Sequence, residues 1–200
     1  MAGDARAAEE LAQEALELDL GEAELYEFVV APAMHRIGRM WAAGEISVAH
    51  EHLATRIATQ VLVLAHELAN LPVHRAGRRA VLAAVEGEQH VVALEMAGNL
   101  LDSAGYEVVS LGADVPTDSL AAIVADHPPD LFLFSATSAE AAARLPAAVS
   151  AVTAERSEVG VIIGGAGIPR GFALGPRVVI DRSVIDVVDA ADVLRNAGLN

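Results

Sequence analysis

The sequence predicts an α/β protein in which a helical bundle precedes a parallel β-sheet domain. Apolar residues recur at helical spacing over residues 5–71, with no strand-like alternation. After Leu71-Pro72, short runs rich in Val, Leu, Ile and Phe alternate with amphipathic segments, which is typical of strands joined by crossover helices. We therefore expect two domains, residues 1–75 and residues 76–200.

Four helices are expected in the first domain, because turn signals divide it into four periodic segments. Gly21 ends the first segment, and Pro32 begins the third, since proline fits the first turn of a helix but breaks its interior. Ser47 is a suitable N-cap for the fourth. The expected helices cover residues 5–18, 23–30, 32–44 and 47–70.

The second domain is predicted to be a flavodoxin-like (Rossmann-like) domain with five parallel strands and helices on both faces. Ligands of such sheets bind beyond the carboxyl ends of the strands, where the strand order reverses. A site is therefore expected in the loops after Val85, Ser110, Ser135 and Ile163. Expected strands cover residues 79–85, 107–110, 131–135, 159–163 and 178–180, and expected helices cover 91–104, 117–126, 139–155, 169–173 and 183–197.

Composition excludes several kinds of chemistry. The chain has no cysteine and no lysine, which rules out disulfides, thiolate metal sites, Schiff bases and lysine-dependent phosphate loops. Its net charge of −15 opposes direct binding to a nucleic acid. Because there is no long apolar stretch and the N-terminus is acidic, we expect a cytoplasmic protein without a membrane partner.

The loop after the first predicted strand contains a histidine with a carboxylate two residues before it. Glu88 could hold one ring nitrogen of His90 protonated, which would orient the other nitrogen toward a metal. A loop histidine can equally be a solvent-facing polar residue. The pair alone leaves both interpretations open.

Three short motifs extend the pattern. The cobalamin-binding domain family of methionine synthase and methylmalonyl-CoA mutase has D-x-H-x-x-G, then S-x-L, then G-G. Residues 88–93, 135–137 and 164–165 correspond to these, and residues 79–194 resemble that family. The resemblance implies that His90 binds cobalt in place of the cofactor's own dimethylbenzimidazole, with the displaced nucleotide tail in a groove between the sheet and its helices.

The same resemblance implies a set of cofactor-binding residues. Ser135 would hydrogen-bond the nucleotide tail, and Gly164 and Gly165 would let the backbone approach a bulky ring. Each could otherwise be an ordinary turn residue. In full, the cofactor-binding set in this domain is Glu88, Gln89, His90, Ser135, Thr137, Gly164 and Gly165, with His90 as the metal ligand.

Three positions depart from the family pattern. Glu88 replaces aspartate and Thr137 replaces leucine, while Ala93 replaces glycine. Glutamate keeps the charge and reaches one methylene further, so the orientation of His90 should survive. The methyl group of Ala93 could crowd the edge of the corrin ring.

The helical domain carries a second motif. Trp41, nine residues and then Glu51-His52 give W-x9-EH, which resembles the adenosylcobalamin-dependent photoreceptors related to the CarH and LitR regulators. The resemblance implies that the helical domain caps the upper cofactor face, with Trp41 over it and Glu51 and His52 beside the adenosyl group. Alternatively, Trp41 is a core anchor and Glu51-His52 a solvated helix face.

One departure concerns the upper side of the cofactor. In the best-known photoreceptors a histidine follows the tryptophan and binds cobalt after light breaks the cobalt–carbon bond, but Ala42 stands here. Water or another histidine would then take that position. The candidates are His35, His50 and His52, whereas His66, His74 and His127 are expected on the surface.

The resemblance implies a non-catalytic, stand-alone light sensor that binds adenosylcobalamin and lacks the DNA-binding domain of those regulators. Loss of the upper ligand would change its conformation, its homo-oligomeric state or its contact with a protein partner. The alternative is a corrinoid carrier that moves methyl groups between methyltransferases. A mutase subunit is disfavoured, because we expect no substrate-binding barrel in this chain.

Overall fold

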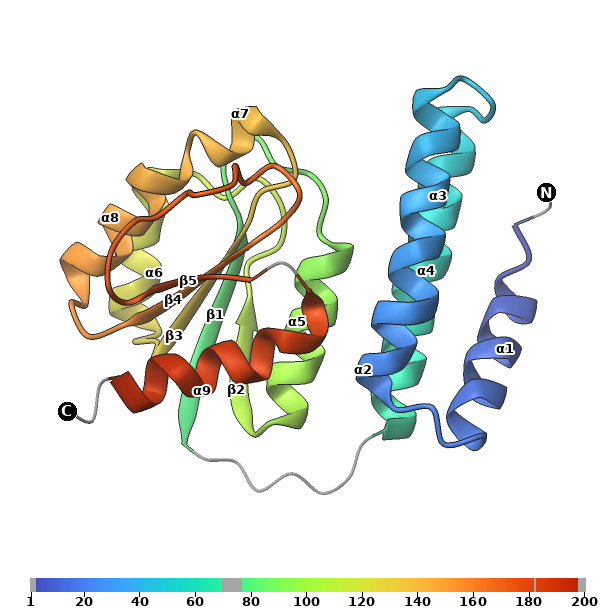
Figure 1. Ribbon diagram of the computed structural model, residues 1–200, viewed down its shortest axis with the longest axis horizontal. Coiled ribbons are helices and arrows are strands. Elements are labelled where there is room, and N and C mark those ends of the chain that lie inside the picture. The colour runs from blue at the N-terminus through green and yellow to red at the C-terminus, as the bar shows by residue number, and fades with distance from the viewer. Residues whose placement is uncertain (1–2, 70–76, 182, 198–200) are drawn as a thin grey trace. The chain divides into compact units, whose positions relative to one another are not determined.

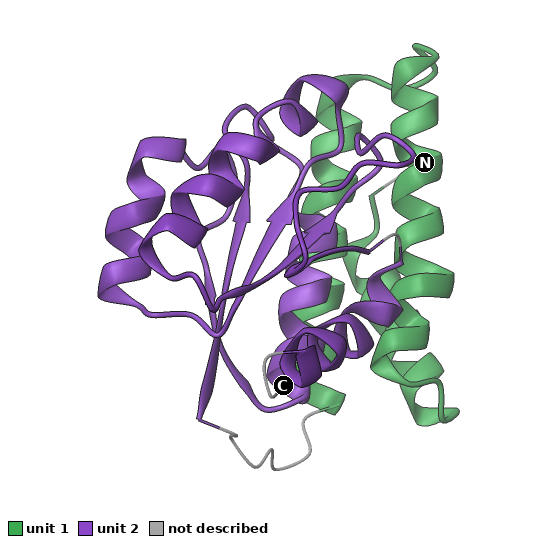
Figure 2. Ribbon diagram, turned by 60° about the vertical axis from the view of Figure 1, so that its left-hand side comes forward, with its two compact units in different colours: residues 1–72 green, residues 73–200 purple. Residues whose placement is uncertain are grey.

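The computed structural model describes residues 3–69, 77–181 and 183–197. The chain divides into two compact units, residues 1–72 and residues 73–200, which Figure 2 shows in different colours. Each unit is described separately. Among the described residues, no helix combines the length and apolar character needed to cross a membrane.

The first unit is entirely helical, and its other helices pack against the long final helix α4 (Figure 1). The buried residues Ala58, Val61, Leu62 and Ala65 recur at intervals of three and four along α4, which gives it an apolar face for the other helices. The elements are α1 (Ala5–Glu17), α2 (Glu22–Leu25), the π-helical segment η1 (Tyr26–Val30), α3 (Ala31–Ala42) and α4 (Val48–Ala69).

The sequence predicts two separate helices that meet before Pro32, but the structure has one continuous helix there. Tyr26, Val30 and Ala31 all keep right-handed helical angles, so α2, η1 and α3 run on without a break. Pro32 lies in the first turn of α3. A π-helical turn shifts the hydrogen-bond pattern by one residue, which accommodates an amide-free residue without ending the helix.

Helix α3 ends in a glycine-based cap. Gly44 has φ +72°, and its amide donates to the carbonyl of Trp41, while the amide of Glu45 donates to that of Met40. This pair of bonds is the Schellman arrangement, which requires a residue that adopts positive φ easily. The cap fixes the direction of the chain immediately after Trp41.

His66 was predicted to lie on the surface, but its side chain is only 20% exposed. Its ring Nδ1 lies 2.9 Å from Oε1 of Glu22, and Tyr26 Oη donates to the same oxygen over 2.7 Å. Glu22 and Tyr26 are buried, so this polar cluster joins α2 to α4 at a largely buried position. His127 is exposed as predicted, and His74 lies outside the described residues.

The second unit contains five parallel strands in the order β2-β1-β3-β4-β5, which confirms the predicted flavodoxin-like sheet. The strand order reverses between β1 and β3, so ligands are expected at that point. The strands are β1 (Arg78–Ala84), β2 (Tyr106–Ser110), β3 (Leu131–Ser135), β4 (Gly160–Gly164) and β5 (Val178–Ile180).

Helices cover both faces of the sheet (Figure 1). Helices α6, α7 and α8 contribute to one apolar core, in which Phe132 and Phe134 of β3 are fully buried. Helices α5 and α9 pack on the other face. The helical elements are α5 (Val92–Ser103), η2 (Thr117–Ser119), α6 (Leu120–Asp126), α7 (Ala139–Ala142), α8 (Leu145–Glu155), η3 (Val184–Asp186) and α9 (Val187–Ala197).

Two predicted helices differ from the structure. The helix expected over residues 139–155 is interrupted between α7 and α8, because Pro146 has no amide hydrogen to continue the helical ladder. The short helix expected over residues 169–173 is a turn, closed by the amide of Phe172 donating to the carbonyl of Pro169. Gly171, with φ +80°, ends it before a second helical turn can form.

We predict that Gly165→Ala destabilises the second unit by at least about 2 kcal/mol, because Gly165 has φ +119° and an added Cβ would lie 2.2 Å from the carbonyl oxygen of Ala136. Urea unfolding followed by circular dichroism measures the change. Gly164→Ala is the control, since the nearest neighbour of its added Cβ would be the backbone oxygen of Asp181 at 3.9 Å. Equal stability of the two variants would contradict the prediction.

Candidate functional site

The loop between β1 and α5 is fastened to the loop after β2. The amide of Glu88 donates to the carbonyl of Val85 over 2.8 Å, and the amide of Asp114 donates to the carbonyl of Glu88 over 2.9 Å. Oδ1 of Asp114 accepts from the amide of Gly87 over 2.7 Å. These bonds hold Glu88 at the carboxyl end of β1.

The side chain of Glu88 is buried and binds the exposed His90. Oε1 of Glu88 lies 2.6 Å from the ring Nδ1 of His90 and accepts the backbone amide of the same residue over 2.8 Å. The side chain of Glu88 is 2% exposed, whereas that of His90 is 72% exposed. A rigid, buried carboxylate therefore orients a solvent-facing imidazole.

The second carboxylate oxygen of Glu88 is held by Thr137, which follows β3. Both the backbone amide and the hydroxyl of Thr137 donate to Oε2, the hydroxyl over 2.7 Å. The hydroxyl oxygen also lies 3.0 Å from Nδ1 of His90. The two motif departures at positions 88 and 137 are thus in direct contact, across the β1/β3 reversal point.

These contacts set the charge of Glu88. Burial raises the pKa of its carboxyl, but hydrogen bonds from the amides of His90 and Thr137, from the Thr137 hydroxyl and from the His90 ring together bring the pKa below its ordinary value of 4.5. Glu88 is therefore a carboxylate at neutral pH. It favours the His90 tautomer that carries its proton on Nδ1, which leaves Nε2 as the metal-binding nitrogen.

Small residues lie side by side at the carboxyl ends of three neighbouring strands. Ala84 pairs with Ser135, and Ser135 pairs with Gly164. Ser135 is buried, and its hydroxyl makes no hydrogen bond with any other residue that the structure describes. A Cβ on Gly164 would meet only one atom within 4 Å. This row presents only small side chains on the sheet face that α5 and α9 cover.

Gly165 has a structural role that the sequence did not indicate. Its missing Cβ permits close contact with the backbone of Ala136, and Gly167 approaches the backbone of Ser138 in the same way. Gly167 was not among the predicted residues, although the G-x-G spacing after a predicted strand could have indicated it. Both glycines fasten the loop after β4 to the loop after β3.

The predicted residues of the helical unit lie on α3 and α4. Trp41 is 48% exposed. Glu51 is mostly buried, and its two oxygens bind different partners: Oε2 lies 2.7 Å from Nδ1 of His52, and Oε1 accepts from the hydroxyl of Thr55 over 2.9 Å. Nε2 of His52 is therefore turned away from Glu51.

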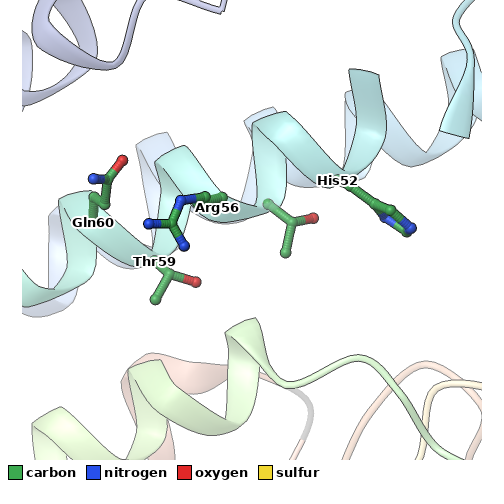
Figure 3. A pocket seen from close by; sticks show the side chains of 5 residues that line it. His52, Arg56, Thr59 and Gln60 are labelled. Atoms are coloured by element: carbon green, nitrogen blue, oxygen red, sulfur yellow. The ribbon is translucent and has the colours of Figure 1, made fainter. Parts of the chain in front are cut away.

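A shallow hollow runs along α4 beyond His52. Its volume is about 310 Å³, and Figure 3 shows the side chains of His52, Arg56, Thr59 and Gln60 around it. Thr55 completes the lining. Hydroxyl, amide, guanidinium and imidazole groups thus share one stretch of this helix.

The structure brings most of the predicted residues together within their own units. Glu88, His90 and Thr137 form one hydrogen-bonded network, and Glu51 and His52 are bonded in the other unit. Gln89 and Ala93 are exposed, and their side chains form no hydrogen bond with the described residues of this network.

Two domain families match the sequence. Residues 78–180, more than half of the chain, match the B12 binding domain, and residues 1–64 match a second family of the same description. The chain belongs to the B12-binding proteins. It is a cobalamin-binding protein, which confirms the resemblance inferred from the motifs.

The B12-binding chain is similar to proteins of two kinds. It is 32% identical over 117 residues to the HTH-type transcriptional repressor CarH of Myxococcus xanthus, covering 58% of this chain and 38% of that protein. It is 27% identical over 135 residues to the trimethylamine corrinoid protein of Methanosarcina barkeri, covering 66% and 62%. The chain thus matches less than two thirds of the length of either relative.

A solved structure shows the same fold over both units. The monomethylamine corrinoid protein of Methanosarcina barkeri matches with a TM-score of 0.74 at 18% identity, over 94% of this chain and 89% of that one. The names of these relatives describe a transcriptional repressor and corrinoid proteins, and none names an enzyme activity. This agrees with the expectation of a non-catalytic cobalamin-binding protein.

We predict that Glu88→Gln lowers the free energy of unfolding at pH 7 by about 1–3 kcal/mol. Each carboxylate oxygen of Glu88 accepts hydrogen bonds from His90 or Thr137, and an amide nitrogen in place of one oxygen could not accept them. The native carboxyl has a lowered pKa, so its contribution is complete above pH 4.5 and is lost as the pH falls through the folded-state pKa. The difference between the two proteins should therefore shrink below pH 4.5 in urea unfolding.

Glu155→Gln serves as the matched control, since Glu155 is an exposed carboxylate at the end of α8. It should unfold like the wild type throughout. A Glu88→Gln penalty that stays constant from pH 7 to pH 3 would contradict the assigned charge of Glu88.

Proposed function

We propose that this protein is a light sensor that binds adenosylcobalamin, with His90 beneath the cobalt and the helical unit over the upper face. The observation that carries the proposal is the exposed imidazole of His90, oriented by a buried carboxylate. A single protein ligand from below suits a metal whose equatorial positions are filled by its own macrocycle. The helical unit supplies Trp41, Glu51 and His52 for the upper side.

The residues of the lower side fit a cobalamin whose own base has been displaced. Nε2 of His90 would bind the cobalt, and Glu88 and Thr137 would keep the ring oriented. The unpaired hydroxyl of Ser135 would meet a polar atom of the displaced nucleotide tail. Because Gly164 has no side chain, the tail could approach the backbone of β4 closely.

The residues of the upper side fit a nucleoside ligand better than a methyl group. Trp41 exposes about half of its surface, which leaves an aromatic ring available to pack on a nucleoside. Glu51 and the neighbouring His52 offer an acceptor and a ring nitrogen that could bind ribose hydroxyls. A methyl group would offer none of these polar contacts.

When bound, the cofactor would supply light absorption and a cobalt–carbon bond that light can break. The response would come from the chain itself. Trp41 and Glu51 would lose their contacts with the departing ligand, so conformations of the helical unit that bind it would no longer be favoured. Ala42 offers no metal ligand, which leaves the upper position to water, His35, His50 or His52.

A corrinoid carrier of a methyltransferase system is the second candidate function. The likeness to the trimethylamine corrinoid protein favours it, since that relative matches 66% of this chain. The two functions differ in the upper ligand that they require. A carrier needs an exchangeable methyl group and no recognition of adenosine.

The deciding experiment is reconstitution of the full chain with adenosylcobalamin in the dark, followed by absorption spectroscopy and sedimentation before and after green light. We expect a spectral change on illumination together with a changed sedimentation coefficient. Adenosylcobalamin should also bind at least about tenfold more tightly than methylcobalamin, since only the former meets Trp41 and Glu51.

Trp41→Ala should reduce that preference while leaving methylcobalamin affinity unchanged, and Phe28→Ala, which removes another exposed aromatic residue of the same helical unit, is the control. A complex that light leaves unchanged would overturn the sensor proposal. A clear preference for methylcobalamin would instead favour the carrier.

A further inference from the structure

The turn that carries Glu88 is fastened to a residue outside the predicted cofactor-binding set. Oδ1 of Asp114, in the loop after β2, accepts the amide of Gly87 over 2.7 Å, and the backbone amide of Asp114 donates to the carbonyl of Glu88 over 2.9 Å. Two hydrogen bonds in opposite directions therefore join Asp114 to two successive residues of the turn. The bond to the carboxylate is charge-assisted, which is the stronger kind.

Both partners have backbone conformations that suit these bonds. Gly87 has φ +84° and is the third residue of a turn closed by the amide of Glu88 donating to the carbonyl of Val85. Asp114 has φ +54°, a left-handed conformation that aspartate tolerates better than most residues. An aspartate at this position therefore supplies a suitable backbone conformation and a hydrogen-bond acceptor together.

The loop that carries Asp114 is itself anchored to the first strand. The amide of Ala84 donates to the carbonyl of Gly112 over 2.9 Å, and the amide of Val115 donates to the carbonyl of Ala84 over 3.1 Å. Val115 also forms an isolated parallel bridge with Val85. Asp114 thus lies between two points at which its loop is bonded to β1, so its carboxylate can hold the neighbouring turn in a fixed position.

The direction of the His90 ring depends on both ends of the Glu88 side chain. The ring is 72% exposed, and within the described part of the chain its hydrogen bonds are to the Glu88 carboxylate and the Thr137 hydroxyl. Thr137 holds the carboxylate end of Glu88, whereas Asp114 holds its backbone end. A shift of the turn at residues 87–88 would therefore be passed on to the imidazole.

We propose that Asp114 is a positioning residue for His90: its carboxylate holds the turn at residues 87–88, and the turn keeps the imidazole in the direction that cobalt binding requires. This inference rests on the proposed role of His90 as the lower ligand of cobalt. Asp114 is exposed, so loss of its carboxylate should disturb the direction of the imidazole more than the stability of the unit. A ligand held off its bonding direction binds a metal more weakly.

The test compares two substitutions at this position with methylcobalamin in the dark, which probes the lower side independently of Trp41 and Glu51. Asp114→Gly removes the carboxylate but adopts the same positive φ without strain, and Asp114→Asn keeps a side-chain oxygen that can accept the Gly87 amide.

We expect Asp114→Gly to bind methylcobalamin at least about fivefold more weakly than the wild type, with an absorption spectrum shifted toward that of cobalamin without a lower nitrogen ligand. Asp114→Asn should bind within about twofold of the wild type and keep its spectrum, because the hydrogen bond to Gly87 is retained.

Asp130→Ala is the matched control, since Oδ2 of Asp130 accepts the amide of Arg79 over 2.9 Å at the opposite end of β1. It removes a hydrogen bond of the same kind, so a general loss of stability in urea unfolding should appear in both variants. Loss of methylcobalamin affinity should appear in Asp114→Gly and not in Asp130→Ala. Circular dichroism checks that each variant is folded.

Hydrogen exchange of the cofactor-free wild type gives a second measurement that depends on no variant. The amide of Gly87 should exchange at least about tenfold more slowly than the same amide in an unfolded chain. An unprotected Gly87 amide, wild-type binding by Asp114→Gly, or equal losses in Asp114→Gly and Asp114→Asn would overturn the proposal.

The variant His90→Ala separates this proposal from the proposed function. If His90→Ala also binds methylcobalamin with unchanged affinity and spectrum, the proposed role of His90 fails, and the positioning role fails with it. If His90→Ala loses affinity while Asp114→Gly binds like the wild type, the role of His90 stands and the positioning role alone is overturned.

Discussion

The carboxylate of Glu88 is the group on which the site depends. It is buried at the point where the strand order reverses, and its charge is sustained by hydrogen bonds from His90 and Thr137 rather than by a cation. Burying a charge is costly unless hydrogen bonds replace its water, and here each oxygen receives at least two short contacts. The consequence is a fixed imidazole at the mouth of the sheet, with one nitrogen committed to the protein and the other free for a metal.

The sheet places this group without help from the helical unit. Parallel pairing brings the loops after β1 and β3 together, so residues 49 positions apart in the chain share one carboxylate. The same pairing aligns Ala84, Ser135 and Gly164 beside it. Gly165 and Gly167 then hold the next loop against β3 through backbone contacts that any side chain would block. The orientation of His90 and the row of small residues beside it are therefore two results of one strand order.

Much of this was predictable from the sequence, because strand runs and their intervening helices have clear periodicities and because His90 lies in the loop that follows the first strand. The contact between Glu88 and Thr137 was not predictable, since it depends on which strands are neighbours. The partial burial of His66 was not predictable either, because its partner Glu22 is 44 residues away. The turn at residues 169–173 and the break before Pro146 show how one glycine or proline overrides a helical pattern.

The central claim is that the imidazole of His90 donates to the corrin metal from below. Its most direct test is the affinity and absorption spectrum of cobalamin bound to His90→Ala, with His127→Ala as the control for removal of an exposed histidine. The account predicts at least about tenfold weaker binding and an altered spectrum for the first variant, and neither change for the second. Undiminished affinity together with an unchanged spectrum for His90→Ala would contradict it.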